Sequence, residues 1–150
     1  DVEWLTHPNW FFRISKYLLP FLKGPYFPKT SFLSELNELP SDLENYVLKP
    51  LFSFAGSGVL IDVTAEQIAQ IKDPENYILQ QKVTYSPLIE DNKGESIKAE
   101  IRLLYIWGEK EARPTLLTNL ARLSKGKMIG VDYNKNKDWV GGSCAFFERD

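Results

Sequence analysis

The first part of the chain carries apolar residues at the spacing of an amphipathic helix. These apolar positions are Trp10, Ile14, Tyr17, Leu18 and Phe21. Residues 6–9 supply helix start signals and Pro20–Gly24 supplies stop signals, so the pattern predicts one helix between them. Two later capping-box patterns, Ser41–Glu44 and Thr64–Gln67, predict short helices, and we expect the second to reach about Ile71.

Apolar, β-branched and aromatic runs predict strands in the rest of the chain. Tyr46–Phe54 and Val59–Val63 flank Ala55–Gly58, which predicts two strands joined by a glycine loop. An antiparallel meander is expected from four further runs, Tyr77–Tyr85, Ile97–Trp107, Pro114–Leu123 and Lys127–Tyr133. In the second of these runs, Lys98, Glu100 and Arg102 share a polar face that could line a site.

Composition narrows the class of protein. The 150 residues are 43% hydrophobic with a net charge of −2, which fits a globular chain of one domain or two small lobes and gives no basic footprint for nucleic acid. No apolar run approaches the roughly 20 residues of a membrane-spanning helix, and Asp1–Thr6 has no signal-peptide pattern, so we expect a cytoplasmic protein without a membrane partner. The single Cys144 and single His7 support neither a disulfide nor a zinc site. Because the chain starts at Asp1 and Phe146–Glu148 looks like mid-strand, we expect it to be part of something longer.

Lys49 is the most unusual residue, since it interrupts the apolar run Tyr46–Phe52. A buried, unpaired ammonium costs several kcal/mol, so such a lysine pairs with a carboxylate, meets a ligand phosphate or reaches water. The loop Ala55–Val59 follows closely, and its glycines would let backbone amides approach a phosphate. An ordinary hairpin turn is the simpler interpretation of that loop taken alone. The loop does not match the P-loop pattern and precedes a strand, so a P-loop is excluded.

Several segments together resemble the ATP-grasp superfamily. In chain order they are Ser15–Tyr17, Phe27–Thr30, Val47–Pro50, Phe54–Val59, Ile78–Val83, Ala99–Arg102, Arg122, Asn134 or Asn136, and Gly141–Gly142. Each segment alone is weak evidence for the family, and the specificity comes from their order and spacing together. The resemblance covers nearly the whole chain. The sequence looks most like ligases that join a carboxylate to an amine, including glutathionylspermidine-synthase-like and glutamate-ligase-like branches.

The resemblance implies an α+β fold with two lobes, antiparallel sheets and a few short helices. Residues 30–85, approximately, would form the glycine-hairpin lobe and residues 86–150 the antiparallel-sheet lobe. It also implies an ATP site in which Lys49 contacts phosphate and the loop residues Gly56, Ser57 and Gly58 close over the triphosphate. Gln80–Val83 would be the hinge between the lobes.

At this hinge, backbone groups of Gln81 and Val83 would meet adenine, with Gln80 and Lys82 beside them. The resemblance further implies that Arg102 and Arg122 face the γ-phosphate or an acyl-phosphate, a role that suits a permanently charged planar fork. Without the resemblance, a surface ion pair is the simpler interpretation of each arginine.

The implied activity is ligation of an unidentified carboxylate through an acyl-phosphate, with ATP and Mg²⁺. The chain departs from the family pattern at Gln81, where a glutamate is common, and its loop has fewer glycines than many members. It also lacks a recognisable acid-x-Asn metal motif, so the metal ligands stay unassigned. Oxygen donors are available at Glu100, Asn134, Asn136 and Glu148. Three interpretations therefore stay open, which are an active ligase, a nucleotide-binding domain without catalysis, and a β-rich interaction module.

Overall fold

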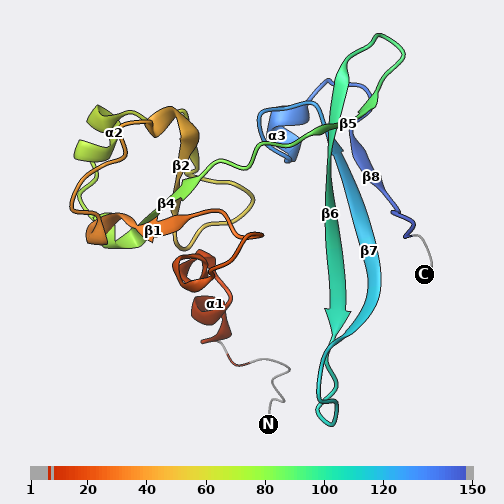
Figure 1. Ribbon diagram of the computed structural model, residues 1–150, viewed down its shortest axis with the longest axis horizontal. Coiled ribbons are helices and arrows are strands. Elements are labelled where there is room, and N and C mark those ends of the chain that lie inside the picture. The colour runs from red at the N-terminus through yellow and green to blue at the C-terminus, as the bar shows by residue number, and fades with distance from the viewer. Residues whose placement is uncertain (1–6, 8, 148–150) are drawn as a thin grey trace. The chain divides into compact units, whose positions relative to one another are not determined.

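The computed structural model describes His7 and residues 9–147, apart from the side chains of residues 13, 131 and 132. The chain divides into two compact units, Asp1–Val83 and Thr84–Asp150, and each is considered by itself (Figure 1). Each unit contains one four-stranded sheet whose paired strands are all antiparallel, and the helices are few and short. The fold is therefore α+β, with two antiparallel sheets.

The sheet of the first unit has the strand order β1-β4-β2-β3. Its strands are β1 (Thr30–Phe32), β2 (Tyr46–Pro50), β3 (Leu60–Ile61) and β4 (Tyr77–Gln81). β2 and β3 pair antiparallel across the glycine loop, which confirms the predicted hairpin, although both strands are shorter than expected. β2 ends at Pro50, which fits the rule that a proline without an N–H is tolerated at the end of a strand.

Each face of this sheet carries its own small core. Leu48 and Leu79 point to one face and pack with Leu33, Val63 and Ile68. On the other face a second cluster consists of Phe32, Leu51 and Ile78, with Leu19 packed against it. Because successive strand residues point to opposite faces, Lys49 and Gln80 lie on the side of the second cluster.

The predicted helix Trp10–Phe21 is interrupted. α1 (Trp10–Arg13) is followed by the 3₁₀ helix η1 (Lys16–Phe21), with Ser15 between them in an extended conformation. The Ser15 hydroxyl accepts a hydrogen bond from the Tyr17 N–H and so caps η1. A serine that starts a new helical turn competes with continuation of the old one, and the apolar spacing does not reveal this break. Of the expected start signals, Thr6 and Pro8 lie outside the described residues.

The two capping-box patterns behave differently. α2 (Ala65–Ala69) has the full box, in which the Thr64 hydroxyl accepts from the Gln67 N–H and the Gln67 side chain accepts from the Thr64 N–H. At the first pattern, only the 3₁₀ helix η3 (Leu43–Asn45) forms, and Asp42 rather than Ser41 occupies the cap position. Two further 3₁₀ turns are η2 (Leu33–Glu35) and η4 (Pro74–Asn76).

The sheet of the second unit is an antiparallel meander of order β5-β6-β7-β8. Its strands are β5 (Pro87–Glu90), β6 (Ser96–Ile106), β7 (Thr115–Ser124) and β8 (Gly141–Ser143). The meander is confirmed, but Tyr77–Tyr85 does not belong to it, because β4 pairs in the other sheet. The predicted strand Lys127–Tyr133 is wrong, since this segment contains bends and the helix α3 (Val131–Asn134). β5 and β8 had no matching strand prediction, and Phe146 and Phe147 form no strand, while Glu148 lies outside the described residues.

Asn134 explains why an apolar run folds into bends here. Its Oδ1 accepts hydrogen bonds from the Ser124 hydroxyl and from the N–H groups of Lys125 and Gly126, at 2.9–3.1 Å. Its Nδ2 donates to the carbonyls of Met128 and Gly130. One amide side chain thus satisfies four backbone groups and one hydroxyl, so these backbone groups need no neighbouring strand.

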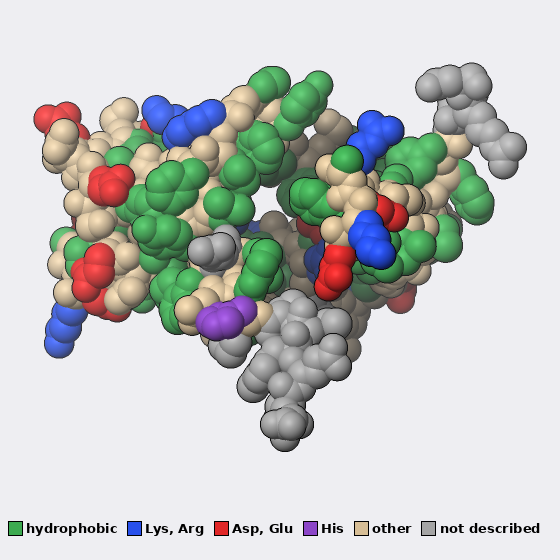
Figure 2. Space-filling model, turned by 90° about the horizontal axis from the view of Figure 1, so that it is seen from below, with side chains coloured by type: hydrophobic (Ala, Val, Ile, Leu, Met, Phe, Trp, Pro, Cys, Tyr) green, Lys and Arg blue, Asp and Glu red, His purple; other side chains and the backbone are tan. Residues whose placement is uncertain are grey.

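Large apolar side chains remain exposed in both units. Figure 2 shows hydrophobic side chains at the surface of each unit. In the second unit they gather on the far half of the β6–β7 hairpin, at Ile101, Leu103, Leu104, Tyr105, Ile106, Trp107, Leu116 and Leu117. Within the described residues, no helix is long and apolar enough to cross a membrane.

The turn between β5 and β6 depends on the carboxylate of Asp91. Its side chain is almost fully buried, forms an ion pair with Lys125, and accepts from the N–H groups of Lys93 and Glu95 at 2.8 Å. The hydrogen bond from Lys125, followed by those from the backbone, lowers the pKa of Asp91 from 3.8 to about 2, although burial opposes the shift. A carboxyl whose folded-state pKa is depressed stabilises the fold above its unfolded pKa.

We therefore expect the stabilisation from Asp91 to be fully present above about pH 4 and lost as the pH falls toward 2. The measurement is urea unfolding of the native chain and of Asp91→Asn between pH 2 and 6. The native chain should be the more stable at pH 6, and the difference should shrink toward pH 2. A difference that is independent of pH would contradict this assignment.

Candidate functional site

Lys49 lies at one end of a chain of hydrogen-bonded polar groups that crosses three strands of the first sheet. Its Nζ donates to Gln80 Oε1 at 2.5 Å, and Gln80 Nε2 donates to Thr30 Oγ1 at 2.8 Å. The Thr30 hydroxyl in turn donates to the Pro28 carbonyl at 2.9 Å. Gln80 and Thr30 are buried and Lys49 is half-buried, so the strand pairing fixes the ammonium against a neutral amide.

A second lysine lies near enough to act on Lys49. Lys16, the first residue of η1, donates from Nζ to the Ser53 hydroxyl at 2.8 Å and to the Ser53 carbonyl at 3.0 Å. Burial lowers the pKa of Lys49, and the charge of Lys16 lowers it further. Burial also lowers the pKa of Lys16. Both shifts mean that the charged forms are held at a cost.

No carboxylate offsets these two charges within the described part of the chain. Every ion pair that the structure records joins other residues, and the partners of Lys16 and Lys49 are neutral. Two partly desolvated ammonium groups without a counter-ion attract an anion strongly. The expected alternative in which Lys49 pairs with a carboxylate is therefore wrong for the described residues.

The glycine loop follows directly from the Ser53 that binds Lys16. Ala55, Gly56 and Gly58 all have positive φ angles, of 51°, 82° and 70°. Two tight turns shape the loop, with hydrogen bonds from Ser57 N–H to Phe54 O at 2.9 Å and from Val59 N–H to Gly56 O at 3.2 Å. In the described structure, the amides of Gly56 and Gly58 donate to no protein group, so they are available to a ligand.

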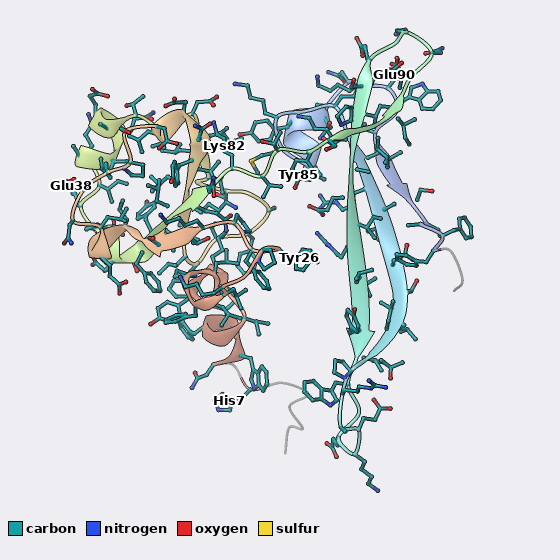
Figure 3. The ribbon with its side chains drawn as sticks, in the orientation of Figure 1. His7, Tyr26, Glu38, Lys82, Tyr85 and Glu90 are labelled. Carbon is teal, nitrogen blue, oxygen red and sulfur yellow. The ribbon has the colours of Figure 1, made fainter. Side chains whose placement is uncertain are left out.

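The predicted hinge Gln80–Val83 ends β4 and the first unit. Gln81 N–H donates to Lys29 O and Lys82 N–H to Asn45 O, both at 2.8 Å, while Val83 N–H makes no backbone bond to a described residue. Lys82, labelled in Figure 3, pairs with Asp62 at 2.7 Å and also donates to the Glu44 carbonyl. Gln80 faces Lys49, whereas Lys82 is neutralised by an acid.

Arg102 and Arg122 belong to the second unit, where both approach one carboxylate. Glu100 Oε1 lies 3.0 Å from Arg122 Nη1 and 3.8 Å from Arg102 Nη2. Arg122 also donates to the Ile129 carbonyl at 2.9 Å and is half-buried, while Arg102 is exposed. The surface ion pair that sequence alone favours is therefore present, and it leaves other guanidinium N–H groups of each arginine available.

Tyr85 is a neighbour of this cluster that the sequence did not indicate. Burial raises the pKa of its phenol, the charge of Glu100 raises it further, and Arg122 opposes the change. Figure 3 shows Tyr85 just before β5. In the sequence, Tyr85 comes shortly before the two strands that lead to Glu100. A single tyrosine at such a position does not predict a contact with these residues.

The oxygen donors considered for a metal are not arranged as a metal site. In the part of the chain that the structure describes, no group of three or more His, Cys, Asp or Glu side chains is placed to hold a metal ion. Glu100 is engaged by arginine, and Asn134 Oδ1 already accepts three hydrogen bonds. Asn136 lines a polar pocket, and Glu148 lies outside the described residues.

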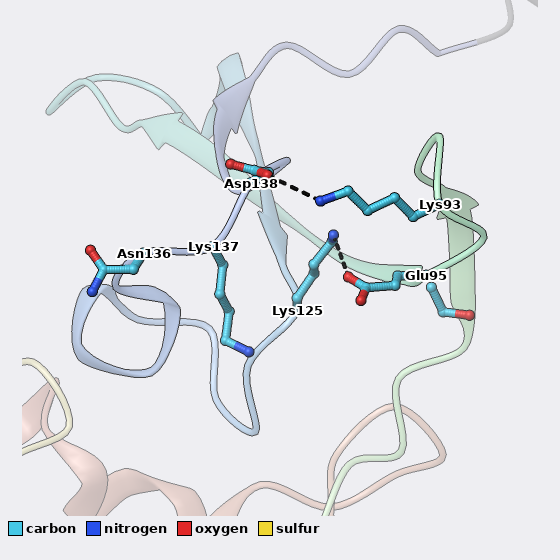
Figure 4. A pocket seen from close by; sticks show the side chains of 7 residues that line it. Lys93, Glu95, Lys125, Asn136, Lys137 and Asp138 are labelled. Atoms are coloured by element: carbon cyan, nitrogen blue, oxygen red, sulfur yellow. Dashed lines mark hydrogen bonds and ion pairs between the residues drawn. The ribbon is translucent and has the colours of Figure 1, made fainter.

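That polar pocket has a cavity volume of about 440 Å³ and collects three lysines, but acids accompany them (Figure 4). Lys125 pairs with Asp91 and with Glu95 at 2.7 Å, and Lys93 lies 3.6 Å from Asp138. Lys125 and Lys93 thus each have an acidic partner that compensates their charge. The pair Lys16 and Lys49 differs because it has no acid.

Comparison of the chain with family models, with curated proteins and with solved structures finds no match in any of the three. What the chain binds must therefore be inferred from its own side chains.

The glycine loop provides a test of how tightly the site is built. A Cβ on Gly58 would lie 2.8 Å from Pro50 Cγ, and the residue has a φ of +70°. We expect Gly58→Ala to lower the free energy of unfolding by about 1–2 kcal/mol from the left-handed backbone, with an added cost from the contact. Gly94→Ala is the matched control, since its φ is +78° and no atom lies within 4 Å of the added carbon. Equal losses in urea unfolding would show that Pro50 does not confine the loop.

Proposed function

We propose that the chain binds ATP, with its phosphates on Lys16 and Lys49, as the nucleotide-binding domain of a ligase that joins a carboxylate to an amine. The observation that carries the proposal is the pair of half-buried lysines whose partners are a glutamine and a serine rather than an acid. A phosphate supplies the negative charge that this arrangement lacks.

The neighbouring loop fits the same ligand. Free amides at Gly56 and Gly58 follow Ser53, and backbone N–H groups on a glycine loop are a common phosphate cradle. Ser53 presents its hydroxyl to Lys16 and would be the first group to give way to an incoming phosphate oxygen. The amide of Val83 would then be the donor for the adenine edge, as the resemblance to ATP-grasp proteins implies.

In this class of reaction the substrate carboxylate attacks the γ-phosphorus of ATP and ADP leaves. An amine then attacks the acyl carbon of the acyl-phosphate, and inorganic phosphate leaves. Charge develops on phosphoryl oxygens, so lysines, arginines, backbone amides and Mg²⁺ serve better than a nucleophilic triad. For the reacting anion the resemblance implies Arg102 and Arg122, and within the second unit each guanidinium keeps N–H groups that Glu100 does not use.

A second candidate function is a β-rich interaction module, which would bind no nucleotide. The exposed apolar residues on the far half of the β6–β7 hairpin favour it, because contiguous exposed apolar surface marks interaction sites. A nucleotide-binding domain without catalysis is compatible with the lysine pair and differs from the ligase only in lacking turnover.

The test is a titration of the isotope-labelled chain with ATP up to millimolar concentrations, followed by NMR. We expect saturable shifts at Lys49, Ser53 and the glycine loop, larger affinity for ATP than for AMP, and at least a tenfold loss of affinity in Lys49→Met and in Lys16→Met. Lys23→Met is the matched control, because Lys23 is an exposed lysine of the same unit.

The stability of the same variants separates a ligand site from a structural one. Lys49→Met removes a desolvated charge and its repulsion with Lys16, and this gain opposes the loss of the hydrogen bond to the buried Gln80 Oε1, so the melting temperature of the ligand-free chain should change little. If Lys49 were half of a structural ion pair, the substitution would instead cost roughly 3–5 kcal/mol. A clear fall in melting temperature with ATP affinity unchanged would refute the role given to Lys49.

A further inference from the structure

A separate pocket in the second unit combines one arginine with apolar walls. It lies among β7, β8 and the α3 segment and has a cavity volume of about 350 Å³. Small-molecule sites typically enclose about 300–1,000 Å³, so this one suits a small ligand. Figure 1 labels the three elements, α3, β7 and β8, that contribute lining residues.

The charged part of the pocket is Arg122. Its guanidinium is fixed by Glu100 on one side and by the Ile129 carbonyl on another, which leaves three of its five N–H groups for a ligand. Lys135 also lines the pocket, and no acidic side chain is among the described lining residues, although Glu100 forms an ion pair with Arg122 from outside the lining. A half-buried guanidinium that is already held in position binds a carboxylate with little loss of side-chain entropy.

The rest of the lining is suited to a hydrocarbon chain. Leu120, Ile129 and Val140 provide apolar walls. Gly142 leaves space at the base of the pocket, because a Cβ at this position would come within 3.1 Å of Leu120 Cδ1. An inorganic anion would gain nothing from these walls, whereas each buried methylene of an aliphatic ligand contributes about 0.8 kcal/mol.

We propose that this pocket binds a small aliphatic monocarboxylate, with the carboxylate on Arg122 and the chain against Leu120, Ile129 and Val140. That this monocarboxylate is the substrate of the ligase rests on the proposed function, but its binding to the pocket requires no nucleotide. The pocket therefore assigns a substrate class, a branched or linear aliphatic acid, to a carboxylate that the sequence left unidentified.

The probe is 4-methylpentanoate, titrated into the labelled chain without ATP and followed by NMR of the methyl groups. We expect saturable shifts at Leu120, Ile129 and Val140. The neutral isostere 4-methylpentanamide tests the charge, glutarate tests the apolar end, and inorganic phosphate tests for a general anion site. Each should bind at least tenfold more weakly than 4-methylpentanoate.

Two variants locate the site. Gly142→Val fills the base of the pocket without a positive-φ penalty and should weaken 4-methylpentanoate at least tenfold. Thr118→Val is the matched control, because it places the same side chain at an exposed position of β7 outside the pocket lining and should leave binding unchanged. Arg122→Met should also abolish binding, and the melting temperature of each variant shows whether the fold is kept.

Several results would overturn the proposal. These are unchanged binding by Gly142→Val, equal affinity for the amide isostere, equal affinity for glutarate or phosphate, and absence of saturable shifts in a folded native chain. Lys49→Met should still bind 4-methylpentanoate. If the native chain binds 4-methylpentanoate but not ATP, the nucleotide site alone is refuted, and if it binds ATP but not 4-methylpentanoate, this pocket alone is refuted.

Discussion

The first unit is organised around the cost of keeping the Lys49 ammonium away from water. The pairing of β2 with β4 and of β4 with β1 places Lys49, Gln80 and Thr30 on one face of the sheet. There each side chain donates a hydrogen bond to the next. The chain of bonds ends on a neutral carbonyl, so it provides hydrogen bonds but no negative charge. Within the described residues, this sheet satisfies its buried polar atoms and still carries a cation without an acidic partner, which supports the proposed anion site.

The sequence predicts these features unequally. The oddity of Lys49 within an apolar run, the β2–β3 hairpin and the capping box of α2 depend on local patterns, and local patterns could be read directly. The break in the first helix could not, because it depends on the Ser15 hydroxyl capping a new turn rather than on apolar spacing. Lys16 was noticed only within the segment Ser15–Tyr17, and its contact with Ser53 could not be predicted because the two residues lie 37 positions apart.

The wrong prediction of a strand over Lys127–Tyr133, where α3 lies, has a different cause. Met128, Ile129 and Val131 suit a strand by propensity. The Asn134 side chain instead forms hydrogen bonds with the backbone groups around them, and no described strand pairs with this segment. Asn134 was noticed as an oxygen donor for a metal, and its amide is instead the centre of a loop. The same loop supplies the Ile129 carbonyl that holds Arg122, so a tertiary hydrogen-bond network, invisible to periodicity, sets the geometry of the arginine.

Ser53 connects the glycine loop to the helical segment that carries Lys16. It binds Lys16 through its hydroxyl and carbonyl, and its neighbours Phe52 and Phe54 make ring contacts with Phe11 of α1 at 5.8 and 5.4 Å between centroids. The start of the glycine loop is therefore held to the helical segment that carries Lys16. An anion that takes Lys16 from Ser53 would release a hydrogen bond at the base of the loop, while the aromatic contacts keep the loop near its place. Binding of the anion and adjustment of the loop would then be coupled through one side chain, with most of the apolar packing preserved.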